Sequence, residues 1–279
     1  MNPTARRVRA LLDELGVGAG ALVYLHTSFS RLAHLELTPV DLIHGLVDHL
    51  GPHGTLVMPS FAWHRDKSAR PWKGYADYYR DRPPFDVRHT PANIGVVPEC
   101  FRSYPGVMRS AHFWWSVAAR GPLAETITSG QQYVVNPYGQ DSAFGRMHLH
   151  GAIILGLGVT LNTTSLAPVV DHEIGAGHTQ VVFSPGLEGG VVVDGAGDRV
   201  TTRAYWLLPE VVRLIKPSSV VARSNGLNGH LRRADHDAVI QFAYPFRAYF
   251  ASAMSLGMNA AAHQQRMPWL EDYGVMQPR

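Results

Sequence analysis

Side chains that can transfer protons or hydrogen-bond a polarised group gather in residues 85–121. This segment carries four Arg, two His and a Trp pair among turn-forming residues, and only residues 93–101 show a helical pattern. One short run brings four polar residues close together in sequence: Arg109, Ser110, His112 and Ser116. The segment therefore predicts a functional site. An irregular surface loop held by proline and glycine is the alternative interpretation.

A second group of polar residues follows a buried strand. The continuous apolar run 21–25 is typical of a strand covered on both faces, and it ends at His26, Thr27 and Ser28. Open α/β sheets bind ligands at the carboxyl ends of such strands. We therefore expect these three residues to lie at a binding site.

Several spaced motifs resemble the aminoglycoside 3-N-acetyltransferase family. The core signature is Thr90-Pro91, Gly95, Glu99, Phe101-Arg102, Arg109-Ser110, His112, Ser116-Val117-Ala118-Ala119 and Gly121. Four further segments agree in order: Val23–Phe29 (VYLHTSF), Gly54–Trp63 (GTLVMPSFAW), Pro137–Met147 (PYGQDSAFGRM) and Leu155–Asp171. The likeness covers roughly residues 5–245, and several motifs in the right order are more specific than any one alone.

The resemblance implies acyl transfer from acetyl-CoA, or another acyl-CoA, to an amine of a small polar metabolite. Such a reaction needs a base for the amine, hydrogen-bond donors at the thioester oxygen and a groove for the pantetheine arm. We assign five residues to binding of the cosubstrate: His26, Thr27, Ser28, Ser110 and Ser116. The alternative for the serines is that they only cap turns.

The family's catalytic base is the feature in which this sequence departs. In the resembled family a Leu-His-x-Ala-Glu motif follows an Asn-x-Thr turn. Aligning that turn with Asn162 places the family Glu at Asp171 and the family His at Pro168, which cannot accept a proton. We name Asp171, His172 and His112 as catalytic candidates, with His26 as a further histidine. For each histidine, a purely structural hydrogen bond is the alternative.

Aromatic and charged residues indicate where the amine substrate would bind and which charge it would carry. We expect Trp63, Tyr78, Glu99 and Trp115 to contact the substrate, although packing in the core also accounts for such aromatic rings. Over residues 65–109 the sequence has five acidic and nine basic side chains. A polycationic aminoglycoside would require carboxylates, so this balance favours a neutral or anionic acceptor and a biosynthetic tailoring enzyme over a resistance enzyme.

Three other functions remain open on the sequence. The first is transfer, condensation or cyclisation of an acyl group delivered by an acyl carrier protein, without the family histidine. The second is a metal-dependent hydrolase that uses His26, His112, Asp171, His172 or His178, but their spacing matches no zinc motif and we expect no metal. The third is a binding protein without catalysis.

The elements that must position these residues alternate between helix and strand. Helices are predicted over residues 4–15, 38–50 and 235–246, with another starting at Thr164 or Ser165. Strands are predicted over 21–25, 55–58 and 152–157, followed by a hairpin or meander over 179–202 that makes the sheet mixed. Residues 64–85 are predicted to form a long excursion over the site. We therefore expect one domain, residues 1–279, with an α/β three-layer fold in which helices flank a central mixed β-sheet.

Composition limits the other classes. The chain has 279 residues, 46% hydrophobic, which is enough for a sizeable core. Cys100 is its one cysteine, so an intrachain disulfide and a cysteine-based zinc cluster are excluded. The net charge of +3 without a Lys/Arg run does not favour nucleic-acid binding, and it suits the anionic coenzyme A. No membrane span or signal peptide is recognisable, which predicts a cytoplasmic protein, and a homodimer is left open.

Overall fold

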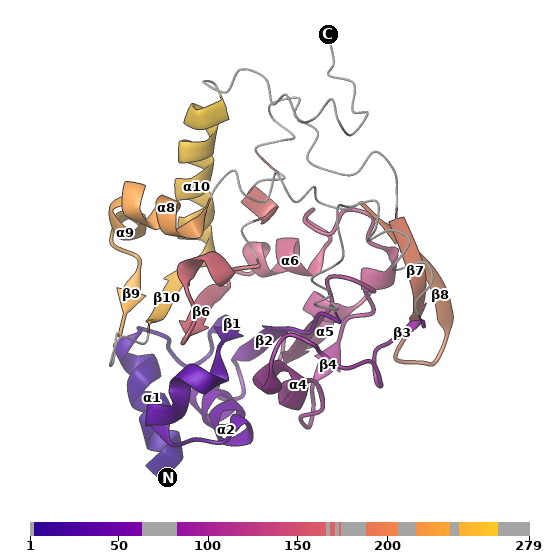
Figure 1. Ribbon diagram of the computed structural model, residues 1–279, viewed down its shortest axis with the longest axis horizontal. Helices are drawn as coiled ribbons and strands as arrows, with labels where there is room; N and C mark the ends of the chain where they lie inside the picture. The colour runs from indigo at the N-terminus through magenta and orange to yellow at the C-terminus, as the bar shows by residue number, and fades with distance from the viewer. Residues whose placement is uncertain are drawn as a thin grey trace.

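The computed structural model describes residues 3–62, 83–165, 168–170, 173, 188–205, 216–234 and 240–261. Its main sheet contains the strands β1 (Leu22–Thr27), β2 (Thr55–Pro59), β4 (Met108–Arg109), β5 (Val117–Arg120), β6 (Ile153–Leu157), β9 (Arg232–Arg233) and β10 (Gln241–Pro245). These form a seven-stranded mixed sheet in the order β4-β5-β2-β1-β6-β10-β9 (Figure 1). The predicted α/β fold with a central mixed sheet is confirmed.

Helices cover both faces of this sheet and make it the middle of three layers. One face carries α1 (Pro3–Glu14), α2 (Pro39–Leu50) and α4 (Val96–Arg102), whose apolar residues share a buried cluster with β1, β2 and β6. The other face carries α5 (Ala124–Thr128), α6 (Ala143–Leu149), α8 (Pro217–Arg223) and α10 (Phe246–Ala261), which contribute to a second cluster. The short α9 (Asn225–Asn228) follows α8, and Figure 1 shows the two helical layers below and above the strands.

Local sequence signals explain where α2 begins and how closely it packs. Thr38 and Asp41 form a reciprocal capping box, and Pro39 occupies the first turn, where its missing N–H is not needed. On its buried face, a Cβ atom at Gly45 would lie 2.9 Å from the Cβ of Val8 in α1. The glycine therefore allows α1 and α2 to approach closely over the sheet.

The register of the central strands brings their carboxyl ends to one edge. Strand β1 runs parallel to β2, with Tyr24 opposite Val57, and parallel to β6, with His26 opposite Gly156. Strand β5 runs antiparallel to β2, with Val117 opposite Pro59, so the residues preceding β5 lie at the same edge. The predicted strand-end residues and the Arg109–Ser116 run are therefore neighbours in space.

A separate three-stranded sheet has the order β3-β7-β8, formed by β3 (Phe85–Asp86), β7 (Glu188–Val193) and β8 (Arg199–Ala204). Strands β7 and β8 form the predicted antiparallel hairpin. The prediction that this hairpin makes the main sheet mixed is wrong, because β5 and β10 are the antiparallel strands there. The hairpin instead pairs with Phe85 and Asp86, at the end of the predicted excursion, of which residues 64–82 lie outside the described residues.

The helix predicted over residues 235–246 is also wrong where the structure describes it. Residues 241–245 form β10, which pairs antiparallel with β6, and α10 starts only at Phe246. A residue that precedes proline avoids the helical conformation, so Pro245 separates the strand from the helix.

Candidate functional site

A cavity of about 490 Å³ lies at the carboxyl ends of β1 and β6. The 3-10 helix η1 (Phe29–Leu35), the start of α4 and the 3-10 helix η3 (Leu161–Thr163) surround it. Its lining residues are Thr27, Ser28, Phe29, Ser30, Arg31, Ile94, Gly95, Val96, Val97, Gly158, Val159, Thr160 and Thr163. The cavity thus occupies the position at which open α/β sheets bind ligands.

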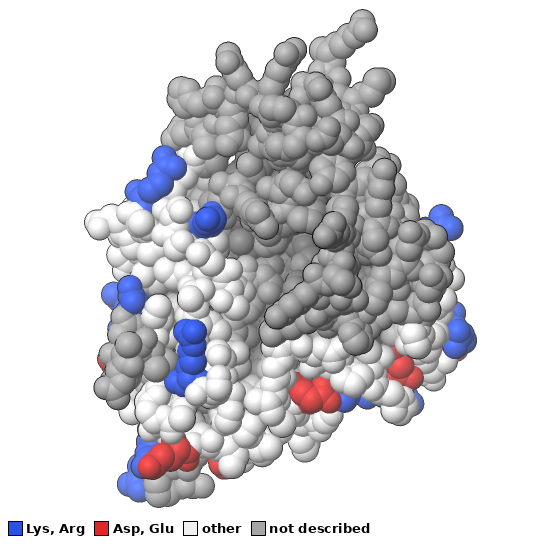
Figure 2. Space-filling model, in the orientation of Figure 1, with Lys and Arg blue, Asp and Glu red and all other residues white. Residues whose placement is uncertain are grey.

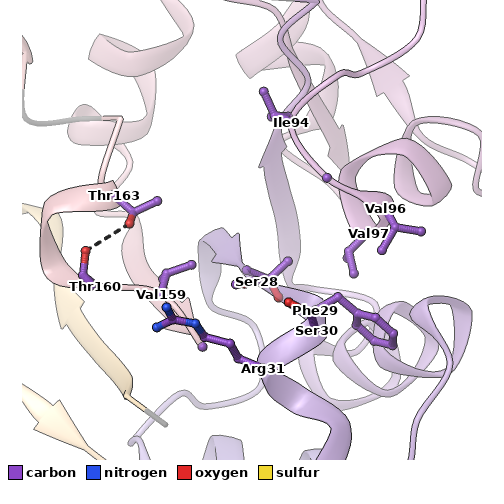
Figure 3. Close-up of a pocket in the computed structure, with 13 residues that line it drawn as sticks. Ser28, Phe29, Ser30, Arg31, Ile94, Val96, Val97, Val159, Thr160 and Thr163 are labelled. Carbon is purple, nitrogen blue, oxygen red and sulfur yellow. Dashed lines mark hydrogen bonds between the residues drawn. The ribbon is translucent and has the colours of Figure 1, made fainter. Parts of the chain in front are cut away.

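The cavity has walls of different chemistry (Figure 3). Hydroxyl groups come from β1, η1 and the segment after β6, namely from Thr27, Ser28, Ser30, Thr160 and Thr163. Apolar side chains come mainly from the opposite wall, namely from Ile94, Val96 and Val97. Such a cavity suits a ligand with a long arm that alternates apolar and hydrogen-bonding groups.

Gly158 shapes the floor of this cavity. Its φ of +69° lies in the left-handed region, which favours glycine. A Cβ atom there would lie 2.9 Å from the carbonyl oxygen of Ser28 and 3.0 Å from the Cβ of Arg31. The glycine therefore lets the chain turn after β6, and its small size allows η1 to pack directly against this turn.

Two buried hydroxyl groups lie near this edge without a hydrogen-bond partner in the described part of the chain. They are Thr27 Oγ1 at the end of β1 and Ser60 Oγ, one residue past β2. The backbone of Ser60 is fixed at both ends, because its N–H donates to Ser116 and its carbonyl accepts from Arg109. Buried hydroxyl groups are normally paired, so both are available to a ligand or to water.

His26 is 4% exposed, at the end of β1. Its Nε2 accepts a hydrogen bond of 3.4 Å from the backbone N–H of Ser165, which leaves the proton on Nδ1, and its ring meets the ring of Tyr24 edge-on. Burial lowers the pKa of His26 to about 3. The side chain is neutral at physiological pH and links β1 to the segment after β6.

His112 is 2% exposed, in the loop before β5. Its Nδ1 accepts from the backbone N–H groups of Trp114, at 3.1 Å, and Trp115, at 2.9 Å. The proton must therefore sit on Nε2, which has no partner within the described residues. Burial lowers the pKa of His112 to about 3. The geometry makes His112 a neutral hydrogen-bond donor.

The serines of the same run are used within the β4–β5 hairpin. The hydroxyl of Ser110 accepts from the N–H of Val117 at 2.9 Å, and the hydroxyl of Ser116 donates to the carbonyl of Ser110 at 2.9 Å. Both serines are fully buried, and neither is among the residues that line the cavity.

Arg109 ties this hairpin to its surroundings. Its guanidinium donates to the carbonyl of Ser60 at 2.7 Å, to the carbonyls of Val87 and Thr90, and to Ser116 Oγ. Burial lowers the pKa of Arg109 to about 9, so the group keeps its charge at neutral pH. The arginine thus holds the carboxyl edge in place through acceptors on three segments.

Glu99 pairs with Arg102 one turn along α4, with Nε to Oε2 at 2.7 Å, and accepts from the N–H of Ala92 at 2.7 Å. Glu99 is therefore held within α4 and by the loop that precedes it. Burial raises the pKa of Glu99, but the hydrogen bonds from Arg102 and Ala92 and the nearby arginine charges together outweigh it, so the pKa is lowered.

Trp115 lies on the other side of the sheet edge, in an aromatic cluster with Phe61, Tyr138 and Phe144 at centroid distances of 5.1, 5.4 and 6.0 Å. Tyr24 joins this cluster through Phe144 and contacts His26. Four other predicted site residues, Trp63, Tyr78, Asp171 and His172, lie outside the described residues.

Sequence reasoning located the β1 end of the cavity but missed most of its lining. It did not select Arg31, Val96, Val97, Thr160 or Thr163. The short spacing between Ser28 and Arg31 was the available signal, because residues that directly follow a strand end remain at its edge.

The described residues contain no group of three or more His, Cys, Asp or Glu that could hold a metal ion. Within the same residues, no helix is long and apolar enough to span a membrane. On the described part of the face in Figure 2, charged atoms are scattered and neither sign forms a continuous patch.

Comparison with known proteins identifies relatives with both sequence and fold in common. The family model described as "Aminoglycoside 3-N-acetyltransferase" matches residues 24–218. Aminoglycoside N(3)-acetyltransferase IV from Salmonella sp is 39% identical over 157 residues, which are 55% of this chain and 53% of that protein. Aminoglycoside N(3)-acetyltransferase IX from Micromonospora chalcea is 31% identical over 173 residues, 58% and 59% of the two chains. The alignments thus span little more than half of these relatives.

Solved structures share the fold. The apoenzyme of aminoglycoside acetyltransferase AAC(3)-IVa superposes with a TM-score of 0.70 at 23% identity, over 98% of this chain and 94% of that one. The binary structure of AAC-IIIb with CoASH gives a TM-score of 0.69 at 22% identity, over 92% and 96%. Because the family model matches well over half of the sequence, the chain belongs to the aminoglycoside 3-N-acetyltransferase family.

Proposed function

We propose that this protein transfers an acetyl group from acetyl-CoA to an amine of a small polar metabolite. The observation that carries the proposal is the cavity at the carboxyl ends of β1 and β6, in a chain of this family. Its hydroxyl groups and apolar wall fit the amide groups and methylene chain of a pantetheine arm, and the unpaired Thr27 hydroxyl is a donor for a carbonyl oxygen. The structures of relatives include one with CoASH, which supports the same assignment.

The two sides of the sheet edge have different tasks in this proposal. The cosubstrate lies in the cavity, between η1 and α4, and places its thioester near Thr27 at the end of β1. The acceptor approaches from the side of the aromatic cluster that contains Trp115 and Phe61. His112 supplies a fixed N–H donor, Ser110 and Ser116 support the hairpin, and a base elsewhere keeps the amine neutral.

Two histidines are poor candidates for that base. A general base works best with a pKa near the working pH, and burial lowers the pKa of both His26 and His112 to about 3. In addition, Nδ1 of His112 and Nε2 of His26 already accept backbone N–H bonds. We therefore assign proton acceptance to His172, with Asp171 as the second candidate.

The acceptor in this proposal is a neutral or anionic amine rather than a polycationic aminoglycoside. Relatives are named for aminoglycosides, but the basic excess over residues 65–109 opposes a polycation. In the described part of that stretch, Glu99 is held by Arg102, and Asp86 is held by the backbone and side chain of His89. This favours a tailoring step in biosynthesis over antibiotic resistance.

Binding of acetyl-CoA to the cavity is the first prediction. Val96 lines the cavity and is 48% exposed, so a tryptophan there fills space that the ligand needs. We expect calorimetry to detect acetyl-CoA binding to the wild type and a loss of at least about tenfold in affinity for Val96→Trp, equivalent to about 1.4 kcal/mol.

Val40→Trp is the matched control, because Val40 is 52% exposed in α2 and does not line the cavity. It should bind acetyl-CoA like the wild type. Equal weakening by both tryptophans would place the ligand elsewhere. If the wild type did not bind acetyl-CoA, free acetyl-CoA would be rejected as the donor. Acyl groups attached to a carrier protein would then be the donors to test.

The second prediction concerns pH. A base acts in its deprotonated form, so kcat/KM falls as the pH drops through its pKa. His26 and His112, with pKa values near 3, stay neutral between pH 5 and 8 and cannot produce a limb there. We expect an acidic limb in this range that persists in His26→Gln and His112→Gln and disappears in His172→Ala. A limb that disappears in His112→Gln instead would contradict the assignment.

A further inference from the structure

Arg31 is the one charged residue among those that line the cavity. It makes no ion pair or side-chain hydrogen bond within the described part of the chain. Other arginines on this body do bond through their guanidinium groups to carboxylate or backbone oxygen atoms: Arg7, Arg88, Arg102, Arg109, Arg120, Arg146 and Arg247. Arg31 therefore presents a free cation to the cavity.

The base of this side chain is held while its tip is free. The N–H of Arg31 donates to the carbonyl of Ser28 at 3.0 Å, and Gly158 lies directly against its Cβ. Figure 3 shows the side chain extending from η1 toward Val159 and the segment that carries Thr160 and Thr163. Arg31 is exposed, and its guanidinium is directed across the cavity, where a ligand can reach it.

Hydroxyl groups line the same cavity as this cation. Ser28 and Ser30 lie on η1 or at its start, and Thr160 and Thr163 lie across the cavity, where their hydroxyl oxygens are 3.3 Å apart. No Asp or Glu is among the lining residues. A planar guanidinium with several hydroxyl donors and no competing carboxylate is a set of partners that recognises phosphate, which guanidinium groups bind through two parallel hydrogen bonds.

We propose that Arg31 binds a phosphate group of the acyl donor and sets the preference of the enzyme for phosphorylated donors. This inference rests on the proposed function, since it takes the cavity to be the donor site. The pantetheine arm alone offers no anion, whereas coenzyme A and phosphopantetheine both carry phosphate. Arg31 consequently discriminates between thioesters that share the same reactive end.

Calorimetry with fragments of the donor tests this role. The ligands are coenzyme A, its 3′-dephospho form, 4′-phosphopantetheine, pantetheine and adenosine 3′,5′-bisphosphate, and the proteins are the wild type, Arg31→Gln and Arg31→Lys. We expect Arg31→Gln to weaken coenzyme A by about tenfold or more, because a charge-assisted bidentate bond is lost, while pantetheine binding stays unchanged. Arg31→Lys should bind coenzyme A more tightly than Arg31→Gln but less tightly than the wild type, because lysine keeps the positive charge but cannot form two parallel hydrogen bonds.

The fragments also identify the phosphate. If Arg31→Gln weakens coenzyme A but not its 3′-dephospho form, Arg31 binds the 3′-phosphate. If Arg31→Gln weakens coenzyme A, its 3′-dephospho form and 4′-phosphopantetheine, Arg31 binds the phosphate next to the pantetheine arm, which a carrier-bound donor also carries. Arg9→Gln, at an exposed arginine whose partner is Asp13 in α1, is the matched control and should leave all affinities unchanged.

The outcomes separate this inference from the proposed function. Coenzyme A binding that is insensitive to Arg31→Gln, or equal weakening of pantetheine, overturns the role of Arg31 and leaves the donor site standing. Binding of adenosine 3′,5′-bisphosphate that depends on Arg31, without any acetyl transfer, would support the phosphate site and reject the proposed reaction. Absence of binding for all five ligands in the wild type would overturn both.

Discussion

Replacing Arg109 by alanine is expected to lower the free energy of unfolding by about 3–5 kcal/mol, because three part-buried carbonyl groups lose a donor at once and an unpaired buried group costs about 1–3 kcal/mol. The affected acceptors are the carbonyls of Ser60, Val87 and Thr90. The guanidinium also lies 4.6 Å from the ring centroid of Phe85, a contact that favours a cation over an aromatic face. These partners belong to segments far apart in the sequence, so the arginine acts as a clamp on the carboxyl edge.

Urea unfolding followed by circular dichroism measures this loss. Arg109→Lys keeps a charge but cannot reach all the acceptors, so its stability should fall between those of the wild type and Arg109→Ala. Arg120→Ala is the matched control, because Arg120 ends the neighbouring β5 and donates to a single carbonyl, that of Pro105. It should cost less than about 1 kcal/mol, the net worth of one hydrogen bond. A loss no larger for Arg109→Ala than for Arg120→Ala would contradict the clamp.

The polar run of residues 109–116 shows what sequence can and cannot predict about the site. Its composition correctly indicated an organised polar cluster, since Arg109, Ser110 and Ser116 are bonded to one another or to the same hairpin. It could not reveal that Arg109 reaches the carbonyl of Ser60, because only the pairing of β2 with β5 brings these residues together. By contrast, the Glu99–Arg102 pair follows the local rule for residues three apart on a helix and could have been predicted.

The cavity was predictable only in part for a similar reason. Strand β1 is a continuous apolar run, so the sequence predicted its end and the polar residues that follow. The apolar wall comes from the start of α4, which carries no polar signature and is placed by Val97 and Phe101 packing into the core under the sheet. An apolar side chain can line a cavity or fill a core, and its type alone does not distinguish the two.

The sequence did not predict strand β10, because its pairing with β6 outweighs the helical pattern of the neighbouring residues. Residues 241–245 are too few to establish a period, and the helical run that follows them favours a helix over these residues as well. In the structure Phe242 and Tyr244 face one core while Ala243 faces the other, which is the alternation of a strand. The edge that β6 offers decides the conformation of this segment.

A single added methyl group at Gly156 is expected to cost about 3 kcal/mol of folding free energy, at the upper end of the usual range for overpacking. Gly156 lies within β6, paired with His26 on one side and Phe242 on the other. A Cβ atom there would lie 2.2 Å from Cζ of Phe242, far inside the separation of about 3.5–4.0 Å that carbon atoms prefer. The ring cannot swing away freely, because it is 1% exposed and stacked on Tyr244 at 5.7 Å.

A double-mutant cycle tests whether the ring is the cause. Phe242→Leu alone creates a void and destabilises the protein, but combined with Gly156→Ala it provides room for the methyl group. The double variant should therefore be more stable than the sum of the two single losses predicts. Gly18→Ala is the control, because no atom lies within 4 Å of its added Cβ. Strictly additive losses would mean that the backbone of β6, rather than Phe242, resists the side chain. Coupling would mean that an aromatic ring packed over a glycine fixes the strand whose end forms the cavity.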